Sequence, residues 1–262
     1  MNNLRKIGLS ALAGSLATFS VNAADVTVSG GASISFDDTD RGGDGASGTR
    51  GNGFYMGDSL GFNMSGETDN GIGVAVYYEI DGGALDDYDM TLSGDWGSLK
   101  FNGSGSSAAF GAVDDVTPNA YEEAWDIIDD DGTSTSGSPT VINGGGGGNM
   151  FIYTSPNMGG ATITAAYQND GGAAAVDESY TDFAIAVSPE AMEGLTVGYA
   201  TSDNQVGVAT DSAETTMYVN YAFDAFTVGI QQSDLDHTTA NSDQESMAYG
   251  ITYAVNDDLS IG

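Results

Sequence analysis

The 262-residue sequence has no cysteine, only five lysine and arginine residues, and a single histidine. Without cysteine there is no disulfide framework, and one histidine with no thiol cannot build a zinc site. After the first 23 residues no run of about 18 apolar residues occurs, which excludes membrane-spanning helices there. The few bases face 38 aspartate and glutamate residues, for a formal net charge of −33. Nucleic acid and anionic headgroups are therefore poor partners, whereas metal cations and other positive solutes are good ones.

The first residues have the features of an export signal. Arg5 and Lys6 precede a short apolar segment from Ile7 to Phe19, and the small-residue cleavage pattern "VNA" follows. We therefore predict a signal peptide over residues 1–23 and a mature domain over residues 24–262. The alternative is an uncleaved anchor helix, for which the apolar segment is short.

The sequence then shows a regular alternation of apolar and polar residues. In "DVTVSGGASISF", Val26, Val28 and Ile34 fall on one face, and Thr27 and Ser29 fall on the other. A period of two predicts β-strands, and about thirteen such runs follow one another. Their connections are expected to alternate strictly between short turns and long acidic loops. This layout is typical of an antiparallel up-and-down transmembrane β-barrel, with long loops outside and short turns in the periplasm.

Disorder and a soluble β-sandwich are the two alternatives to a membrane barrel. Disorder fits an acidic chain, but 40% of the residues are hydrophobic and they are patterned, with the charges mainly between the runs. A soluble β-sandwich also has alternating strands, but it has no reason to sort its loops by length. Trp96, Phe223 and Phe226 stand beside short turns, where a membrane barrel carries an aromatic girdle.

Four segments resemble strand-turn-strand signatures of the general (trimeric) porins of Gram-negative bacteria, particularly those of alphaproteobacteria. They are "VTVSGGASISF", "LGFNMSGETDNGIGVAVYYEI", "LSGDWGSLKFNG" and "YTSPNMGGATITAAYQND". The resemblance implies a barrel of sixteen strands, of which about thirteen are present. It also implies a strand ending on an aromatic residue, whereas this sequence ends at Ile261-Gly262, so we expect a C-terminally incomplete copy.

In that family the third long loop folds into the barrel and narrows the pore. The third long connection here is residues 103–148, which is also the longest. The stretch "YEEAWDII" offers one or two helical turns with apolar residues toward the wall and carboxylates toward water. The alternative is a solvated external loop. The expected constriction residues on this loop are Asp114, Asp115, Glu122, Glu123, Trp125, Asp126, Asp129, Asp130 and Asp131.

The resemblance also implies an arginine cluster facing the acidic loop, but the mature chain keeps only Arg41, Arg50 and Lys100 as bases. Lys100 alternates with Leu99 and Phe101, so we expect it to point into the lumen as part of the constriction. The alternative is an isolated interfacial charge. The transverse field across the pore is therefore expected to be weak.

No catalytic set is found. His237 lies in an acidic loop, where a Ser/His/Asp arrangement cannot be argued. The run Gly144 to Gly148 lacks the lysine and helix of a phosphate cradle and reads as a flexible return. Asp129, Asp130 and Asp131 offer hard oxygen ligands, so loosely bound Ca²⁺ or Mg²⁺ is the one metal expected.

The sequence thus predicts a non-enzymatic porin in the outer membrane of a Gram-negative bacterium. It is expected to form a water-filled, cation-preferring channel for small hydrophilic solutes and ions, and to assemble as a homotrimer in contact with membrane lipid. The alternative is a non-conducting structural or adhesive barrel whose acidic loops bind calcium.

Overall fold

The computed structural model describes most of the strands and part of the connection after Ser104. The described residues are 25–36, 54–105, 108–113, 116–119, 142, 144, 148–169, 179–205, 211–238, 243–256 and 259–262. The predicted signal peptide, residues 1–23, lies outside them and stays a prediction. Within the described ranges, no helix has the length and hydropathy that a membrane crossing requires.

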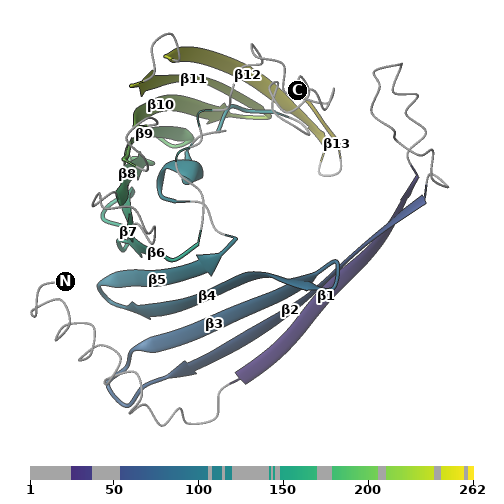
Figure 1. Ribbon diagram of the computed structural model, residues 1–262. Coiled ribbons are helices and arrows are strands. Elements are labelled where there is room, and N and C mark those ends of the chain that lie inside the picture. The colour runs from purple at the N-terminus through teal and green to yellow at the C-terminus, as the bar shows by residue number, and fades with distance from the viewer. Residues whose placement is uncertain are drawn as a thin grey trace, which may run out of the picture. The chain divides into compact units, whose positions relative to one another are not determined.

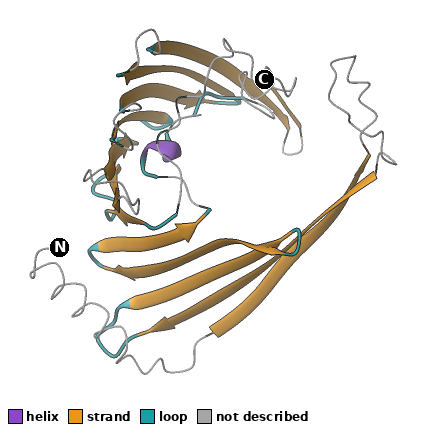
Figure 2. Cartoon of the chain, viewed as in Figure 1, coloured by secondary structure: helices purple, strands orange, loops and turns teal. Residues whose placement is uncertain are grey.

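The chain forms two compact units, Met1–Gly94 and Asp95–Gly262, and both are antiparallel sheets (Figures 1 and 2). In each unit the sheet order follows the sequence, as an up-and-down topology requires, and the prediction of about thirteen antiparallel strands is confirmed. The first unit contains β1 (Asp25–Phe36), β2 (Phe54–Glu67), β3 (Gly73–Asp81) and β4 (Ala84–Gly94). The second contains β5 (Gly97–Ser104), η1 (Phe110–Ala112), β6 (Met150–Thr154), β7 (Ala161–Asn169), β8 (Ser179–Val187), β9 (Leu195–Asn204), β10 (Ser212–Phe223), β11 (Phe226–His237), β12 (Gln244–Asn256) and β13 (Leu259–Ile261).

The predicted strict alternation of short and long connections is wrong at one place. After the short turn between β2 and β3, strict alternation requires a long acidic loop between β3 and β4, but Asp81 pairs directly with Ala84, and only Gly82 and Gly83 lie between the strands. Both glycines have positive φ, 54° and 81°, which a two-residue hairpin turn requires and other residues rarely adopt. The pairing shifts between Tyr78 and Ile80, so the acidic residues expected in a loop lie in the strand beside this irregularity.

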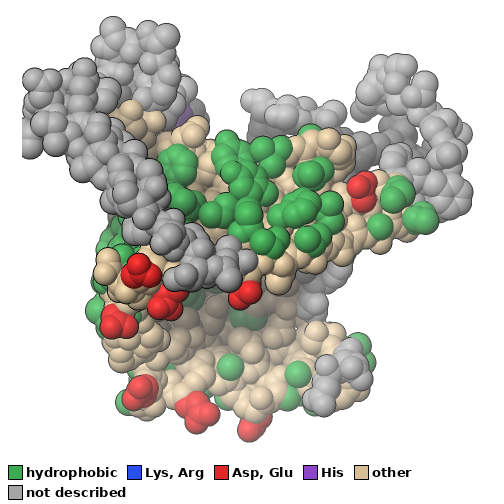
Figure 3. Space-filling view, turned by 90° about the horizontal axis from the view of Figure 1, so that it is seen from below, with side chains coloured by type: hydrophobic (Ala, Val, Ile, Leu, Met, Phe, Trp, Pro, Cys, Tyr) green, Lys and Arg blue, Asp and Glu red, His purple; other side chains and the backbone are tan. Residues whose placement is uncertain are grey.

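The first unit separates apolar and polar side chains onto opposite faces. Cross-strand pairing joins Val26, Met64, Val76 and Met90 in one row. The neighbouring row on the opposite face joins Ser65, Ala75 and Thr91. Figure 3 shows hydrophobic side chains gathered in a broad exposed patch on the face seen from below. So large an exposed apolar surface needs an apolar medium or a partner to cover it.

The second unit has the same two faces. One row consists of Val187, Val197, Val219, Ile230 and Tyr249, and the last three of these are exposed. The opposite face carries small and polar side chains, many of them buried, such as those of the row Ala184, Ala200, Thr216, Ser233 and Ser246.

The aromatic residues predicted beside the short turns lie on the apolar face. Phe223 and Phe226 flank the turn between β10 and β11, with ring centroids 5.6 Å apart. Tyr221 stacks on Phe223 at 5.6 Å, and Tyr253 lies 4.7 Å from Phe226. Trp96, at the turn between β4 and β5, stacks at 6.4 Å on Tyr153, whose hydroxyl donates a hydrogen bond to the Trp96 carbonyl oxygen. Amphipathic rings grouped at one end of the strands are typical of a membrane interface.

Replacing Val76 with lysine should destabilise the protein in phospholipid vesicles. Val76 lies on the apolar face, where a buried charge costs up to about 4 kcal/mol at the bilayer midplane. Ala75→Lys is the matched control, because Ala75 is exposed on the polar face between Ser65 and Thr91. Denaturant titrations followed by tryptophan fluorescence should show a lower unfolding free energy for Val76→Lys only. Equal losses in both variants would contradict this assignment of the faces.

Candidate functional site

The described parts of the segment between β5 and β6 pack against the polar face of the second unit. Figure 1 shows strands β6–β12 curving around η1, which lies on their concave side. The segment leaves β5, contacts β8 and β9 through η1, and reaches β11 and β12 at Pro118. The inward folding predicted for the constriction loop is therefore observed in its described residues, and an external loop is not.

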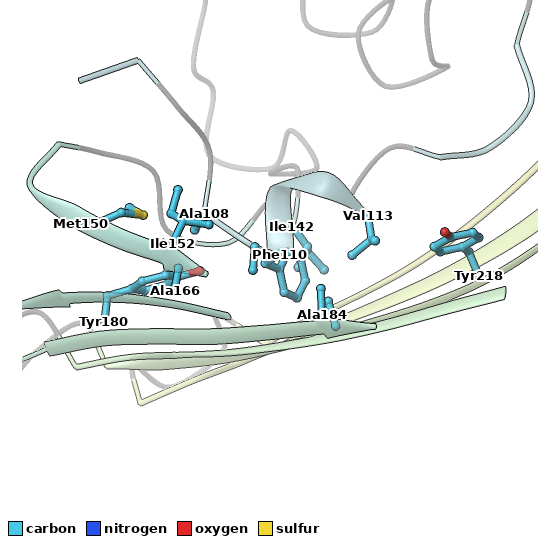
Figure 4. Close-up of a cluster of buried hydrophobic side chains, with 12 residues drawn as sticks. Ala108, Phe110, Val113, Ile142, Met150, Ile152, Ala166, Tyr180, Ala184 and Tyr218 are labelled. Carbon is cyan, nitrogen blue, oxygen red and sulfur yellow. The ribbon is translucent and has the colours of Figure 1, made fainter. Parts of the chain in front are cut away.

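Apolar contacts hold η1 on the sheet. Phe110 is fully buried, and Val113 and Ile142 are 3% and 5% exposed. Figure 4 shows these three side chains pointing toward the strands, with Ala184 of β8 beneath them. The small side chains on the concave face leave room for this cluster, which joins the part of the segment before residue 114 to the part at Ile142.

Asp182 of β8 is the buried acceptor at the start of η1. Its side chain is 6% exposed. One carboxylate oxygen accepts hydrogen bonds from the backbone N–H of Phe110, at 2.6 Å, and from the Tyr180 hydroxyl, at 3.0 Å. The other oxygen accepts the backbone N–H of Ala166 at 2.9 Å. The Ala109 N–H also donates to this carboxylate. Asp182 thus joins two neighbouring strands to the free amides at the start of η1.

Glu214 of β10 is the acceptor that binds the part of the segment returning toward β6. Its carboxylate accepts a hydrogen bond from the backbone N–H of Gly144 and another from the Ser202 hydroxyl, at 3.4 Å. Gly144 has a φ of 73°, and a Cβ there would lie 2.7 Å from the Cβ of Phe110. A glycine is therefore required at this position. The expectation of a flexible return for the run Gly144 to Gly148 did not include this requirement.

A third set of hydrogen bonds fixes Val116. Its N–H donates to Oε1 of Gln231 at 3.1 Å, and its carbonyl oxygen accepts from Nδ2 of Asn220 at 2.5 Å. Gln231 in turn donates to Ser233, which shares a 2.6 Å hydrogen bond with Thr216. Gln231, Ser233 and Thr216 are buried, and their mutual hydrogen bonds keep the cost of that burial low, whereas Oδ1 of Asn220 is buried without a partner among the described residues.

Pro118 lies against two paired glycines, Gly229 of β11 and Gly250 of β12, on the polar face of the sheet. A Cβ added at Gly229 would lie 2.5 Å from Cδ of Pro118, and one added at Gly250 would collide with the Pro118 carbonyl oxygen. The two glycines face each other across β11 and β12. Their lack of side chains lets the backbone of the segment approach the sheet closely.

Most of the predicted constriction residues lie outside the described residues, so their roles stay predictions: Asp114, Asp115, Glu122, Glu123, Trp125, Asp126, Asp129, Asp130 and Asp131. The proposed metal ligands are the last three of these. Within the described residues, no group of three or more His, Cys, Asp or Glu side chains is placed to hold a metal ion.

Lys100 is the one predicted constriction residue that the structure describes. It pairs with Ile152 of β6, and the row continues through Ala166, Asp182, Ser202 and Glu214. Lys100 therefore belongs to the row that binds the segment, and its part in a constriction stays a prediction. His237 lies at the end of β11, where its backbone N–H donates to Asp243.

Sequence reasoning missed Asp182 and Glu214. The acidic residues in the connections drew attention, whereas these two lie within strand patterns, at positions of the polar face. A lone carboxylate at an inward position of a strand was the available signal. The positions of its amide partners, 72 residues earlier for Phe110, could not be read from a local pattern.

An up-and-down antiparallel sheet with an apolar outer face, a polar inner face and a segment folded against that inner face defines the class of outer-membrane channel barrels. A model of the Gram-negative porin family matches residues 8–262, and the chain belongs to this family. It is accordingly a passive channel of the outer membrane. None of the curated proteins matches the sequence.

Solved porin-fold structures resemble the chain in three dimensions. The match to the OmpT outer membrane protein of Vibrio cholerae, with loop L8 deleted, covers 90% of this chain and 78% of the OmpT chain, with a TM-score of 0.59 and 13% identity. The match to the anion-selective porin from Comamonas acidovorans covers 89% of this chain and 75% of that porin, with a TM-score of 0.57 and 17% identity. The match to the trimer form of in-vitro folded OmpT from Vibrio cholerae covers 90% of this chain and 74% of that protein, with a TM-score of 0.57 and 12% identity. At these identities the likeness shows the β-barrel fold.

Replacing Phe110 with alanine should loosen the segment and leave the strands intact. The cavity costs about 3–5 kcal/mol of packing, and this loss falls on the contact between η1 and the wall. We expect proteinase K to cleave the variant at lower concentrations than the parent, with unchanged strand content by circular dichroism. Phe183→Ala, on the outer face of β8, is the control. Equal protease resistance of Phe110→Ala and Phe183→Ala would contradict the docking described here.

Proposed function

We propose that this porin forms a water-filled, cation-preferring channel for the passive diffusion of small hydrophilic solutes and ions. The observation that carries the preference is the charge imbalance, 38 acidic residues against five basic ones. Fixed carboxylates around a pore raise the local concentration of cations and oppose the entry of anions.

The described polar faces support this preference. Lys100 is the single lysine or arginine among the described residues. The polar face of the first unit carries Glu79 and Asp81 on β3 and Asp89 on β4, opposite Gly61, Ser59 and Tyr77 respectively. Glu79 is also held in place, since the Tyr77 hydroxyl donates a 2.9 Å hydrogen bond to it. No base of the described residues on this face opposes these carboxylates.

The porin from Comamonas acidovorans is described as anion-selective, so the shared fold does not fix the sign of the preference. The sign depends on which charged side chains line the pore. This chain supplies an acidic set, and we therefore propose the opposite sign from that relative.

Two further proposals accompany the channel. We propose a homotrimer, as the trimer form of OmpT shows for a protein of the same fold. We also propose that Ca²⁺ or Mg²⁺ binds loosely at Asp129, Asp130 and Asp131, where adjacent carboxylates repel one another and a divalent cation offsets the repulsion.

The charge selectivity is tested with the refolded protein in a planar bilayer. With a KCl gradient across it, the zero-current potential should have the sign of cation preference. The potential should shrink at high salt, because the Debye length falls from about 10 Å at 0.1 M to about 3 Å at 1 M. Anion preference at low salt would refute the proposal. The absence of single channels would favour the alternative, a structural or adhesive barrel.

Neutralising three acidic residues of the segment together tests the proposed constriction. We expect Glu122→Gln, Glu123→Gln and Asp126→Asn in one variant to reduce the zero-current potential at low salt, because carboxylates nearest the narrowest point act most strongly on passing ions. The matched control removes three charges from the outer face, at Asp203, Asp234 and Asp236. An equal reduction in both variants would mean that the segment carboxylates do not line the pore.

A further inference from the structure

Asp182 and Glu214 bind two different parts of the segment from one row of the wall. We define the outgoing limb as residues 108–113 and 116–119 and the return limb as Ile142 and Gly144. Asp182 accepts N–H donors of the outgoing limb, and Glu214 accepts the N–H of Gly144 on the return limb. Ser202 lies between the two acids in the row, and it pairs with each of them across the sheet.

The donors show that these carboxylates serve the backbone. Asp182 binds the amides of Ala109, Phe110 and Ala166 together with the Tyr180 hydroxyl. Hydrogen bonds to an ionised acceptor are stronger than those between neutral groups, and a carboxylate accepts several N–H groups at once. A single inward acid can therefore fasten the segment to two strands, whereas a serine or an amide at that position offers one acceptor oxygen in place of two.

We propose that Asp182 and Glu214 are positioning residues that clamp the two limbs independently and so fix the width and steadiness of the pore. This inference rests on the channel function proposed above. The clamp acts through the segment: Asp182 holds the start of η1, and Glu214 holds the return limb at Gly144.

The chain has no cysteine, so a single introduced thiol reports the accessibility of each limb. Val113→Cys marks the outgoing limb and Ile142→Cys marks the return limb, since both side chains are buried. In Asp182→Asn the side chain keeps one acceptor oxygen, so the N–H groups of Phe110 and Ala166, which bind different oxygens of Asp182, compete for it. We expect the Val113→Cys thiol to react about tenfold faster with a water-soluble maleimide in that background, as a lost charged hydrogen bond implies. Glu214→Gln should accelerate labelling of Ile142→Cys in the same way.

The effects should be limb-specific. Asp182→Asn should raise the labelling rate of Val113→Cys more than that of Ile142→Cys. Glu214→Gln should raise the labelling rate of Ile142→Cys more than that of Val113→Cys. Asp203→Asn is the matched control, because it removes the same charge from the outer face of β9, where Asp203 accepts a hydrogen bond from Gln205. Heat-modified migration on gels checks that every variant is folded, and each acid is tested separately so that one unfolded variant leaves the other informative.

Single-channel recording gives the functional readout. Asp182→Asn and Glu214→Gln should each raise the open-channel current noise at least twofold over the control, because a limb freed from the wall moves within the pore. Labelling rates and noise equal to those of Asp203→Asn would overturn the clamp. A parent protein that does not conduct would instead overturn the channel function, and labelling would still decide whether the two acids hold the limbs.

Discussion

The whole structure depends on the pairing of backbone N–H and C=O groups between neighbouring strands. In a hydrocarbon medium an unpaired group costs several kcal/mol, so antiparallel pairing must run from strand to strand. The pairing also fixes which side chains share a face, because residues opposite each other in the register point the same way. The apolar row through Val76 and the polar row through Ala75 follow directly from it.

Much of the fold could be predicted because strand patterning is local. The alternation in residues 25–36 predicts β1 with its observed bounds, and Phe223 and Phe226 were correctly expected beside a short turn. The turn at Gly82 and Gly83 was missed, because acidic residues on both sides resembled a loop. The backbone preferences of two glycines decided that connection, and the carboxylates were accommodated in the strand.

The site was less predictable, because its contacts are long-range. The inward folding seen in the described part of residues 103–148 was expected from the family resemblance and from the apolar residues of that stretch, whereas the groups that hold the segment were not expected. Asp182, Glu214 and Gln231 each lie in an ordinary strand pattern, and only the curvature of the sheet brings them to Phe110, Gly144 and Val116. Two sets of acids on the polar faces thus differ in role: Asp182 and Glu214 bind amides of the segment, whereas the acids on the polar face of β3 and β4 bear on the proposed charge preference.

The attachment of the segment has a consequence for the order of assembly. Every described anchor of η1 and its flanks lies later in the chain, 72 residues after Phe110 in one case and 115 residues after Val116 in another. The surface that receives the segment exists only once β8–β12 have paired, and closing such distant contacts is slow. Docking of the segment is therefore expected to be a late step of maturation, after the strands that receive it have paired.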